Sequence, residues 1–217
     1  MSKHIVIVGG GAALAQPLID HWGKGSEWQV TVVCRSKTPV HPCAGMVIKR
    51  RVTEIHEPWD VLVTLTGDVD NAPLSLMTDY QWRMAIEANL THPFEALRYL
   101  LPHAREQANV VVVGSIVGSI GSRGCANYAA AKAGLIGLVR AAANEYAYKS
   151  LCTNLLELGY MDVGMGSRLQ PEVRDKALST IPLKRFGTVE DFVLAVEFLS
   201  KTRYMSGGVL TLAGGLR

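Results

Sequence analysis

Short runs of apolar and mostly β-branched residues recur along the chain, and longer segments of mixed polarity separate them. Continuous apolar runs of this kind are typical of strands that are buried on both faces of a parallel sheet. Seven strands are predicted in this way, at residues 5–8, 30–33, 46–48, 61–63, 110–113, within 151–158 and at 208–212.

The segments between these runs carry apolar residues at helical spacing. Leu14, Leu18 and Trp22 form one stripe, and long helices are predicted over residues 79–103 and 126–148. Strands that alternate with helices indicate an α/β fold, here a Rossmann-type doubly wound parallel sheet of about seven strands in a single domain of residues 1–217. The chain between the second and fourth strands is too short for ordinary crossover helices, so we expect shortened crossovers around the third strand.

Composition narrows the possible partners. Hydrophobic residues make up 48% of the chain and charged residues 19%, which suits a buried sheet and buried subunit contacts. The net charge of +3 is too small to indicate nucleic acid, and the one basic cluster, residues 49–51, is interpreted as a solvated strand end. The spacing of the four cysteines and six histidines predicts neither a disulfide framework nor a metal site. Without a signal-peptide layout or an apolar stretch that could span a bilayer, we expect a cytoplasmic protein with no membrane partner.

A hydroxyl, a phenol and an ammonium are predicted to meet at the carboxyl end of the fifth strand. Ser115 follows the apolar run 110–113 and is therefore placed at the end of this strand. Tyr128 and Lys132 are four residues apart and lie on one face of an alanine-rich helix. Proton transfer to a carbonyl oxygen needs one group to polarise the oxygen, one to protonate it and a cation that eases ionisation of the phenol. A Tyr-x-x-x-Lys pair alone is common by chance, so the argument depends on the upstream serine.

The turn after the first predicted strand is rich in glycine. In a parallel sheet this turn is the ordinary place for a dinucleotide pyrophosphate, because glycines such as those at residues 9–11 let the backbone come close and the next helix offers its N-terminus. Arg35 stands at the end of the second strand, where an arginine suits a ribose 2′-phosphate. NADPH is therefore favoured over NADH. The alternatives are a purely conformational turn and an exposed surface arginine.

With these residues in place, the chain resembles the classical short-chain dehydrogenase/reductase family, and its second half is most similar to the β-ketoacyl-[acyl carrier protein] reductase branch. The likeness continues after Lys132 at residues 133–137, 182–191, 198–200, 204–208 and 213–215. The resemblance implies a catalytic tetrad of Asn89, Ser115, Tyr128 and Lys132. It also implies a set of cofactor-binding residues, which are Gly9, Gly11, Leu14, Arg35, Ser36, Thr66, Gly67, Tyr128, Lys132, Gly159 and Met161.

Asn89 also has a physical interpretation of its own. Pro93 has no amide hydrogen to give to the carbonyl of Asn89, so this carbonyl is free to hold a water molecule. In the family, such a water relays protons between the lysine and solvent. The alternative is a helix kink that serves packing only.

The activity implied by the resemblance is NADPH-dependent reduction of a β-ketoacyl group or a related ketone to a hydroxyl. Ser115 would bind the carbonyl oxygen and Tyr128 would protonate it. Lys132 and the oxidised nicotinamide would together lower the pKa of the phenol, and Lys132 would also hold the nicotinamide ribose. The substrate is expected to be a small molecule or a group bound to a carrier protein. The family buries its long helices between subunits, so a homo-oligomer, a dimer or a tetramer, is expected.

The departures from the family concern the cofactor side. Residues that differ from the family pattern there are Ala13, Ala15, Thr64, Thr66 and Val163. We expect an open adenosine end, with the edge near residues 46–48 shielded by residues 39–42, by Trp59 or by another protein. This pattern leaves a second hypothesis open, a catalytically silent dinucleotide-binding sensor or partner subunit with the same fold.

Overall fold

A single parallel sheet forms the centre of the molecule. The computed structural model describes residues 2–25, 27–34, 41–43 and 45–217. Seven strands pair in the order β3-β2-β1-β4-β5-β6-β7, and every pair is parallel. The strands are β1 Lys3–Val8, β2 Trp28–Val33, β3 Val47–Lys49, β4 Trp59–Thr64, β5 Ala104–Ser115, β6 Cys152–Leu158 and β7 Val209–Leu212. The predicted fold class and all seven predicted strands are confirmed.

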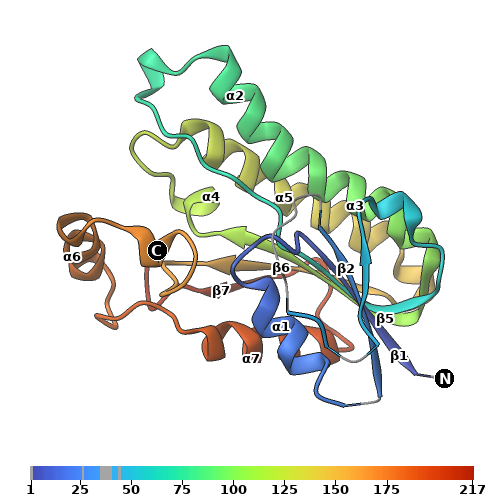
Figure 1. Cartoon of the computed structure of the whole chain (residues 1–217). Coiled ribbons are helices and arrows are strands. Elements are labelled where there is room, and N and C mark those ends of the chain that lie inside the picture. The colour runs from blue at the N-terminus through green and yellow to red at the C-terminus, as the bar shows by residue number, and fades with distance from the viewer. Residues whose placement is uncertain (1, 26, 35–40, 44) are drawn as a thin grey trace.

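Helices cover both faces of this sheet (Figure 1). One face lies under α3 and α5, with α2 packed on α5, and the other lies against α1 and α7. The helices are α1 Ala15–Trp22, α2 Asp79–Ile86, α3 His92–Leu100, α4 Val117–Ile120, α5 Ala126–Glu145, α6 Pro171–Thr180 and α7 Val189–Lys201. Among the described residues, no helix is both long enough and apolar enough to cross a membrane.

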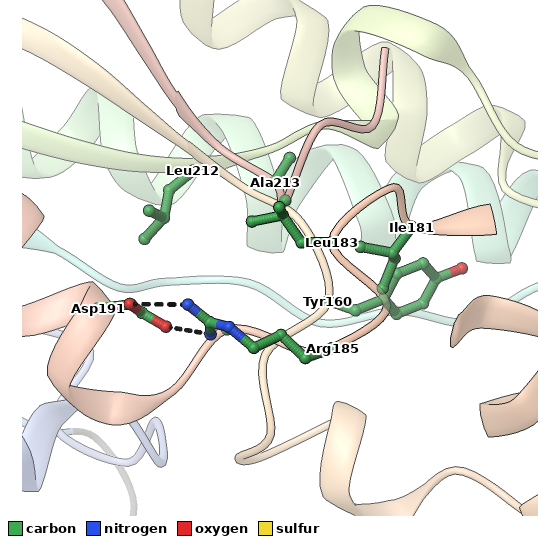
Figure 2. Close-up of a pocket in the computed structure, with 9 residues that line it drawn as sticks. Tyr160, Ile181, Leu183, Arg185, Asp191, Leu212 and Ala213 are labelled. Carbon is green, nitrogen blue, oxygen red and sulfur yellow. Dashed lines mark hydrogen bonds and ion pairs between the residues drawn. The ribbon is translucent and has the colours of Figure 1, made fainter. Parts of the chain in front are cut away.

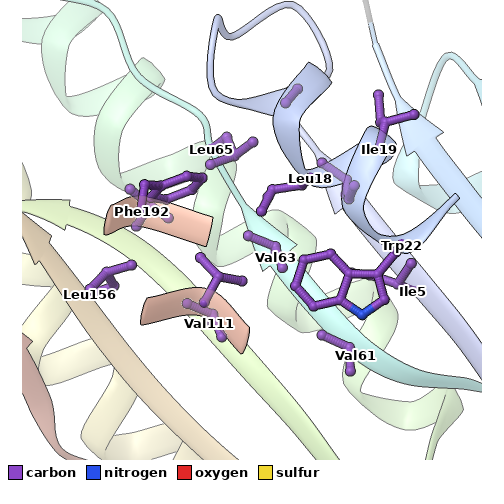
Figure 3. Close-up of a cluster of buried hydrophobic side chains, with 14 of the residues drawn as sticks. Ile5, Leu18, Ile19, Trp22, Val61, Val63, Leu65, Val111, Leu156 and Phe192 are labelled. Carbon is purple, nitrogen blue, oxygen red and sulfur yellow. The ribbon is translucent and has the colours of Figure 1, made fainter. Parts of the chain in front are cut away.

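Alternate residues of each strand enter two separate cores. In β5, Val111 packs toward α1 and α7, whereas Val110 and Val112 pack toward α3 and α5. Figure 3 shows the first of these cores, where Trp22 of α1 and Phe192 of α7 lie over the sheet. A strand that is buried on both sides has no polar face, which is why the sequence shows continuous apolar runs.

The crossovers around β3 are short, as expected. β3 has three residues, and the nine residues that join it to β4, all of them described, form only one turn of 3-10 helix at Val52–Glu54. The expectation that Trp59 shields the sheet edge is wrong. Trp59 is fully buried under α3, where its Nε1 donates to the carbonyl of Leu100 at 2.8 Å, and β2 and β1 separate its strand from β3.

The predicted helix over residues 79–103 is interrupted. α2 begins with a capping box between Thr78 and Gln81, and it runs into a π turn at Glu87–Thr91 before α3 begins. In this turn the amide of His92 donates to the carbonyl of Glu87, five residues earlier. Pro93 cannot donate a hydrogen bond in the α-helical pattern, so the sequence around it favours such an interruption. A final 3-10 turn, Leu101–His103, completes the segment.

Candidate active site

The predicted tetrad lies where β5 meets α5 and the π turn. Ser115 is the last residue of β5 and pairs with Leu158 of β6, three residues beyond Val112, the last residue of β5 that pairs with β4. Tyr128 and Lys132 lie in the first two turns of α5, and Asn89 lies in the π turn. Because the carboxyl ends of parallel strands share one edge of the sheet, segments that are distant in sequence converge here.

Tyr128 is almost fully buried, and its hydroxyl makes a hydrogen bond with Ser115. Burial raises the pKa of the Tyr128 phenol above its usual value, and the hydrogen bond with Ser115 opposes this increase only in part. The expected lowering of this pKa by Lys132 is therefore wrong for the chain on its own. The physical reason is that burial disfavours the phenolate more strongly than its neighbours favour it.

Lys132 is 5% exposed. Its Nζ donates to the carbonyls of Thr66, at 3.3 Å, and Val113, at 3.2 Å, and it lies 5.7 Å from the centre of the Tyr128 ring. Burial lowers the pKa of this ammonium from 10.5 to about 8. Such a lysine can gain or lose a proton near neutral pH, which an exposed lysine does not do.

Asn89 faces the same cluster from the π turn. Its side chain is fully buried, and its Nδ2 donates to the carbonyls of Asp68, at 2.6 Å, and Ala85, at 2.9 Å. Its Oδ1 has no hydrogen-bond partner in the described part of the chain. A β-carbon at Gly67 would lie 2.7 Å from this oxygen and 3.4 Å from the Lys132 ammonium. Any residue other than glycine at position 67 would therefore clash with Oδ1 of Asn89 and crowd Nζ of Lys132.

Asn127 is a residue to which sequence reasoning gave no role. It is fully buried, and its Oδ1 accepts the amide hydrogen of Tyr128 at 2.8 Å, one of the donors that a helix start leaves unpaired. Its Nδ2 donates to the carbonyls of Asp70 and Gln81, both at 3.1 Å. The Asn127 side chain therefore connects the backbone of Tyr128 to the loop after β4 and to α2. The amide next to the tyrosine in the motif was the only signal available in the sequence.

The glycine-rich turn after β1 is tight, and only glycine fits at position 9. Gly9 has a φ of +99°, and a β-carbon there would lie 2.9 Å from the carbonyl carbon of Leu65. The amides of Gly9 and Gly10 both donate to the carbonyl of Val33, which holds the turn against β2. The turn leads through Gly11 and Leu14 into α1, where the amide of Ala15 already donates to the carbonyl of Ala12 at 2.9 Å and Pro17 has no amide hydrogen.

The remaining predicted cofactor residues lie along the same edge. Thr66 and Gly67 follow β4, and the Thr66 hydroxyl is buried without a hydrogen-bond partner among the residues that the structure describes. Gly159 follows β6, where a β-carbon would lie 2.8 Å from Cα of Ala213. The Met161 side chain is buried in the core beside α1 and α7, so only its backbone is available to a ligand. Arg35 and Ser36 lie outside the described residues.

A separate pocket of about 60 Å³ lies between the end of β7 and residues 181–187 (Figure 2). Arg185 and Asp191, which line it, form an ion pair with Nη1 and Oδ2 2.7 Å apart, and this pair lowers the pKa of the Asp191 carboxyl to about 2. The pocket has room for a few water molecules. It does not include a tetrad residue and is too small for a dinucleotide.

Comparisons with known proteins agree with this geometry. A sequence model of a protein family described as enoyl-(acyl carrier protein) reductase matches residues 46–217. The chain is 34% identical over 173 residues to a 3-oxoacyl-[acyl-carrier-protein] reductase of Thermotoga maritima, covering 78% of this chain and 70% of that protein. It is 33% identical over 179 residues to the reductase of the same name from Staphylococcus epidermidis, covering 79% and 73% of the two chains.

A crystal structure from Burkholderia thailandensis, an oxidoreductase of the short-chain dehydrogenase/reductase family, is 25% identical and superposes with a TM-score of 0.88, covering 100% of this chain and 93% of that one. The present chain belongs to the short-chain dehydrogenase/reductase family. It is accordingly an NAD(P)-dependent oxidoreductase that acts on CH–OH or carbonyl groups. The family match begins at residue 46, after the glycine-rich turn, and this agrees with the unusual residues found in that turn.

Proposed function

We propose that this short-chain dehydrogenase/reductase uses NADPH to reduce a ketone, a β-ketoacyl group or a close relative of one, to a hydroxyl. The observation that carries the proposal is the convergence of the Ser115 hydroxyl, the Tyr128 phenol and the Lys132 ammonium at the end of β5. A carbonyl oxygen placed near Ser115 and Tyr128 would meet two hydroxyl donors at once.

Each residue of the tetrad has a role that follows from its position in the site. Ser115 hydrogen-bonds the carbonyl oxygen and polarises it, and Tyr128 donates its phenolic proton to the same oxygen. The raised pKa of Tyr128 keeps the phenol protonated, ready to act as the acid. When bound, NADPH supplies the hydride for the carbonyl carbon.

Lys132 and Asn89 return a proton to the Tyr128 phenol after it has protonated the substrate. The pKa of Lys132, about 8, lets its ammonium exchange protons near neutral pH, and the ammonium lies close to the phenol that must be reprotonated. We propose that the main-chain carbonyl of Asn89, to which Pro93 cannot donate, holds a water molecule that links the lysine to solvent.

The cofactor is held, in this proposal, by the turn at Gly9–Gly11 and Leu14, by Thr66 and Gly67, and by the backbone at Gly159 and Met161. Arg35 and Ser36 are proposed to bind the adenosine 2′-phosphate. Support for NADPH comes from the sequence at Arg35. The structure of ElxO with NADP bound has a TM-score of 0.86 at 21% identity, and this likeness shows only a shared fold.

The substrate class is proposed from the relatives. Two of them are named as reductases of 3-oxoacyl groups on acyl carrier protein, so we propose a β-ketoacyl substrate, either free or carrier-bound. The family model instead carries the name of an enoyl reductase, which reduces a carbon–carbon double bond. We also propose a homo-oligomer, with α2, α3 and α5 at the subunit contact.

The experiment that tests this proposal combines a fluorescence titration with NADPH and a turnover assay. Free β-ketoesters, carrier-linked β-ketoacyl groups and an enoyl thioester form the substrate panel. Binding with turnover of a ketone supports the proposal. Turnover of the enoyl thioester alone would favour the other reductase chemistry, and binding without any turnover would favour a sensor.

A further inference from the structure

A buried carboxylate lies one strand away from Ser115. Glu157 of β6 is 3% exposed, and in the sheet it is paired with Gly114 of β5 on one side and Thr211 of β7 on the other. It interrupts the apolar run of Leu155, Leu156 and Leu158. Burying a carboxylate is costly unless hydrogen-bond donors replace the lost water.

Two hydroxyls supply these hydrogen bonds, and they come from different elements. The Thr211 hydroxyl of β7 donates to Oε2 at 3.2 Å, and the Ser119 hydroxyl of α4 donates to Oε1. The carboxylate therefore joins the edge of the sheet to the short helix that follows β5.

The helix α4 is held from its other side by α5. A β-carbon at Gly118 would lie 2.8 Å from the carbonyl carbon of Lys132 and 2.9 Å from the amide nitrogen of Ala133, so no other side chain fits there. Four residues make no stable helix by themselves, so α4 depends on these contacts for its position. It is fixed between the backbone of Lys132 and the carboxylate of Glu157.

The position of α4 determines the surroundings of the Ser115 hydroxyl. The amide of Val117, the first residue of α4, donates to Oγ of Ser115 at 3.3 Å. The amide of Ile116 is bound to the carbonyl of Leu158 at 2.9 Å, which fixes the chain just before α4. Movement of α4 would thus change the direction of the Ser115 hydroxyl.

We propose that Glu157 is a positioning residue, which acts through Ser119 and α4 to aim the Ser115 hydroxyl at the carbonyl oxygen of the substrate. This inference rests on the proposed function, because it assigns Ser115 to that oxygen. Thr211 binds the same carboxylate but belongs to β7, which does not lead to Ser115. The two hydroxyls therefore separate positioning of the serine from simple stabilisation of Glu157.

The test compares Ser119→Ala with its matched control Thr211→Val. Each variant removes one hydrogen bond to Glu157, so both should lower the free energy of unfolding in urea to a similar extent. Only Ser119→Ala should lower kcat, by about tenfold, because small misplacements of a catalytic group are costly. The KM and the dissociation constant for NADPH should not change in either variant. Ser119→Thr, which keeps a hydroxyl, should restore most of kcat.

Three results would overturn the inference while wild-type turnover persists. These are an equal loss of kcat in Ser119→Ala and Thr211→Val, no loss in either, or failure of Ser119→Thr to recover activity. Glu157→Leu should reproduce the loss seen in Ser119→Ala, and if that variant does not fold, the two hydroxyl variants still decide. A wild-type protein that reduces no ketone would instead refute the proposed function, and this inference with it.

Discussion

Replacement of Lys132 by methionine should remove a pH dependence of the free energy of unfolding that the burial of this lysine causes. In the folded chain without cofactor, burial holds the pKa of Lys132 at about 8, whereas the unfolded chain has the ordinary value of 10.5. Between these two values the unfolded chain binds more protons than the folded one, so the free energy of unfolding rises with pH. Below pH 8 the full cost of burying the charge is present.

The size of this cost follows from the two pKa values. At about 1.4 kcal/mol per pKa unit, the difference corresponds to about 3 kcal/mol, of which about 2 kcal/mol falls between about pH 7.5 and about pH 9.5. Urea unfolding of the wild type without cofactor should show this rise. In Lys132→Met the rise should be absent, because the buried group no longer titrates.

The lost hydrogen bonds to Thr66 and Val113 do not affect this comparison, since they are missing at both pH values. Lys149→Met is the matched control, because Lys149 also donates to two backbone carbonyls, those of Pro102 and Ala104, from a half-buried position. If the wild type and Lys132→Met show the same change with pH, or if Lys149→Met gives the same difference as Lys132→Met, burial of Lys132 is not the cause.

Three further predictions concern other parts of the molecule. Asn127→Ala should lower the free energy of unfolding by about 2–4 kcal/mol in urea, because the carbonyls of Asp70 and Gln81 and one helix amide lose their partner; a change below about 0.5 kcal/mol would contradict the assigned role. Arg35→Asp should weaken NADPH binding about tenfold and narrow or reverse the preference over NADH in a fluorescence titration, and an unchanged preference would leave Arg35 as a surface residue. Light scattering should give the mass of a dimer or tetramer at micromolar concentration, and a monomer would refute the proposed oligomer.

The sheet could be predicted from the sequence because its signal is local and repeated. A strand that is buried on both faces is apolar at most of its positions, and each predicted run overlaps a strand of the structure. The shortness of the crossovers around β3 could be predicted as well, because it depends only on chain length. The helix α4 could not be predicted, since four residues are too few to show a helical period.

The site was predictable only in part. Its positions follow from topology, because Ser115 ends a strand and Tyr128 and Lys132 share one helix face. The raised pKa of Tyr128 in the chain without cofactor could not be predicted, because it depends on how deeply the folded chain buries the phenol. The partners of Asn127 and Glu157 lie tens of residues away in the sequence and are brought together only by folding.

The central claim is that Tyr128 is the acid that protonates the substrate carbonyl. Its most direct test is the rate of NADPH oxidation by Tyr128→Phe with a β-ketoacyl substrate. The rate is measured at an NADPH concentration that the titration shows to saturate each protein. The variant keeps the ring and leaves Lys132 in place, so NADPH should bind nearly as in the wild type. Without the phenolic proton, turnover should fall by at least about a hundredfold. Turnover near the wild-type rate in a variant that binds NADPH normally would contradict the account.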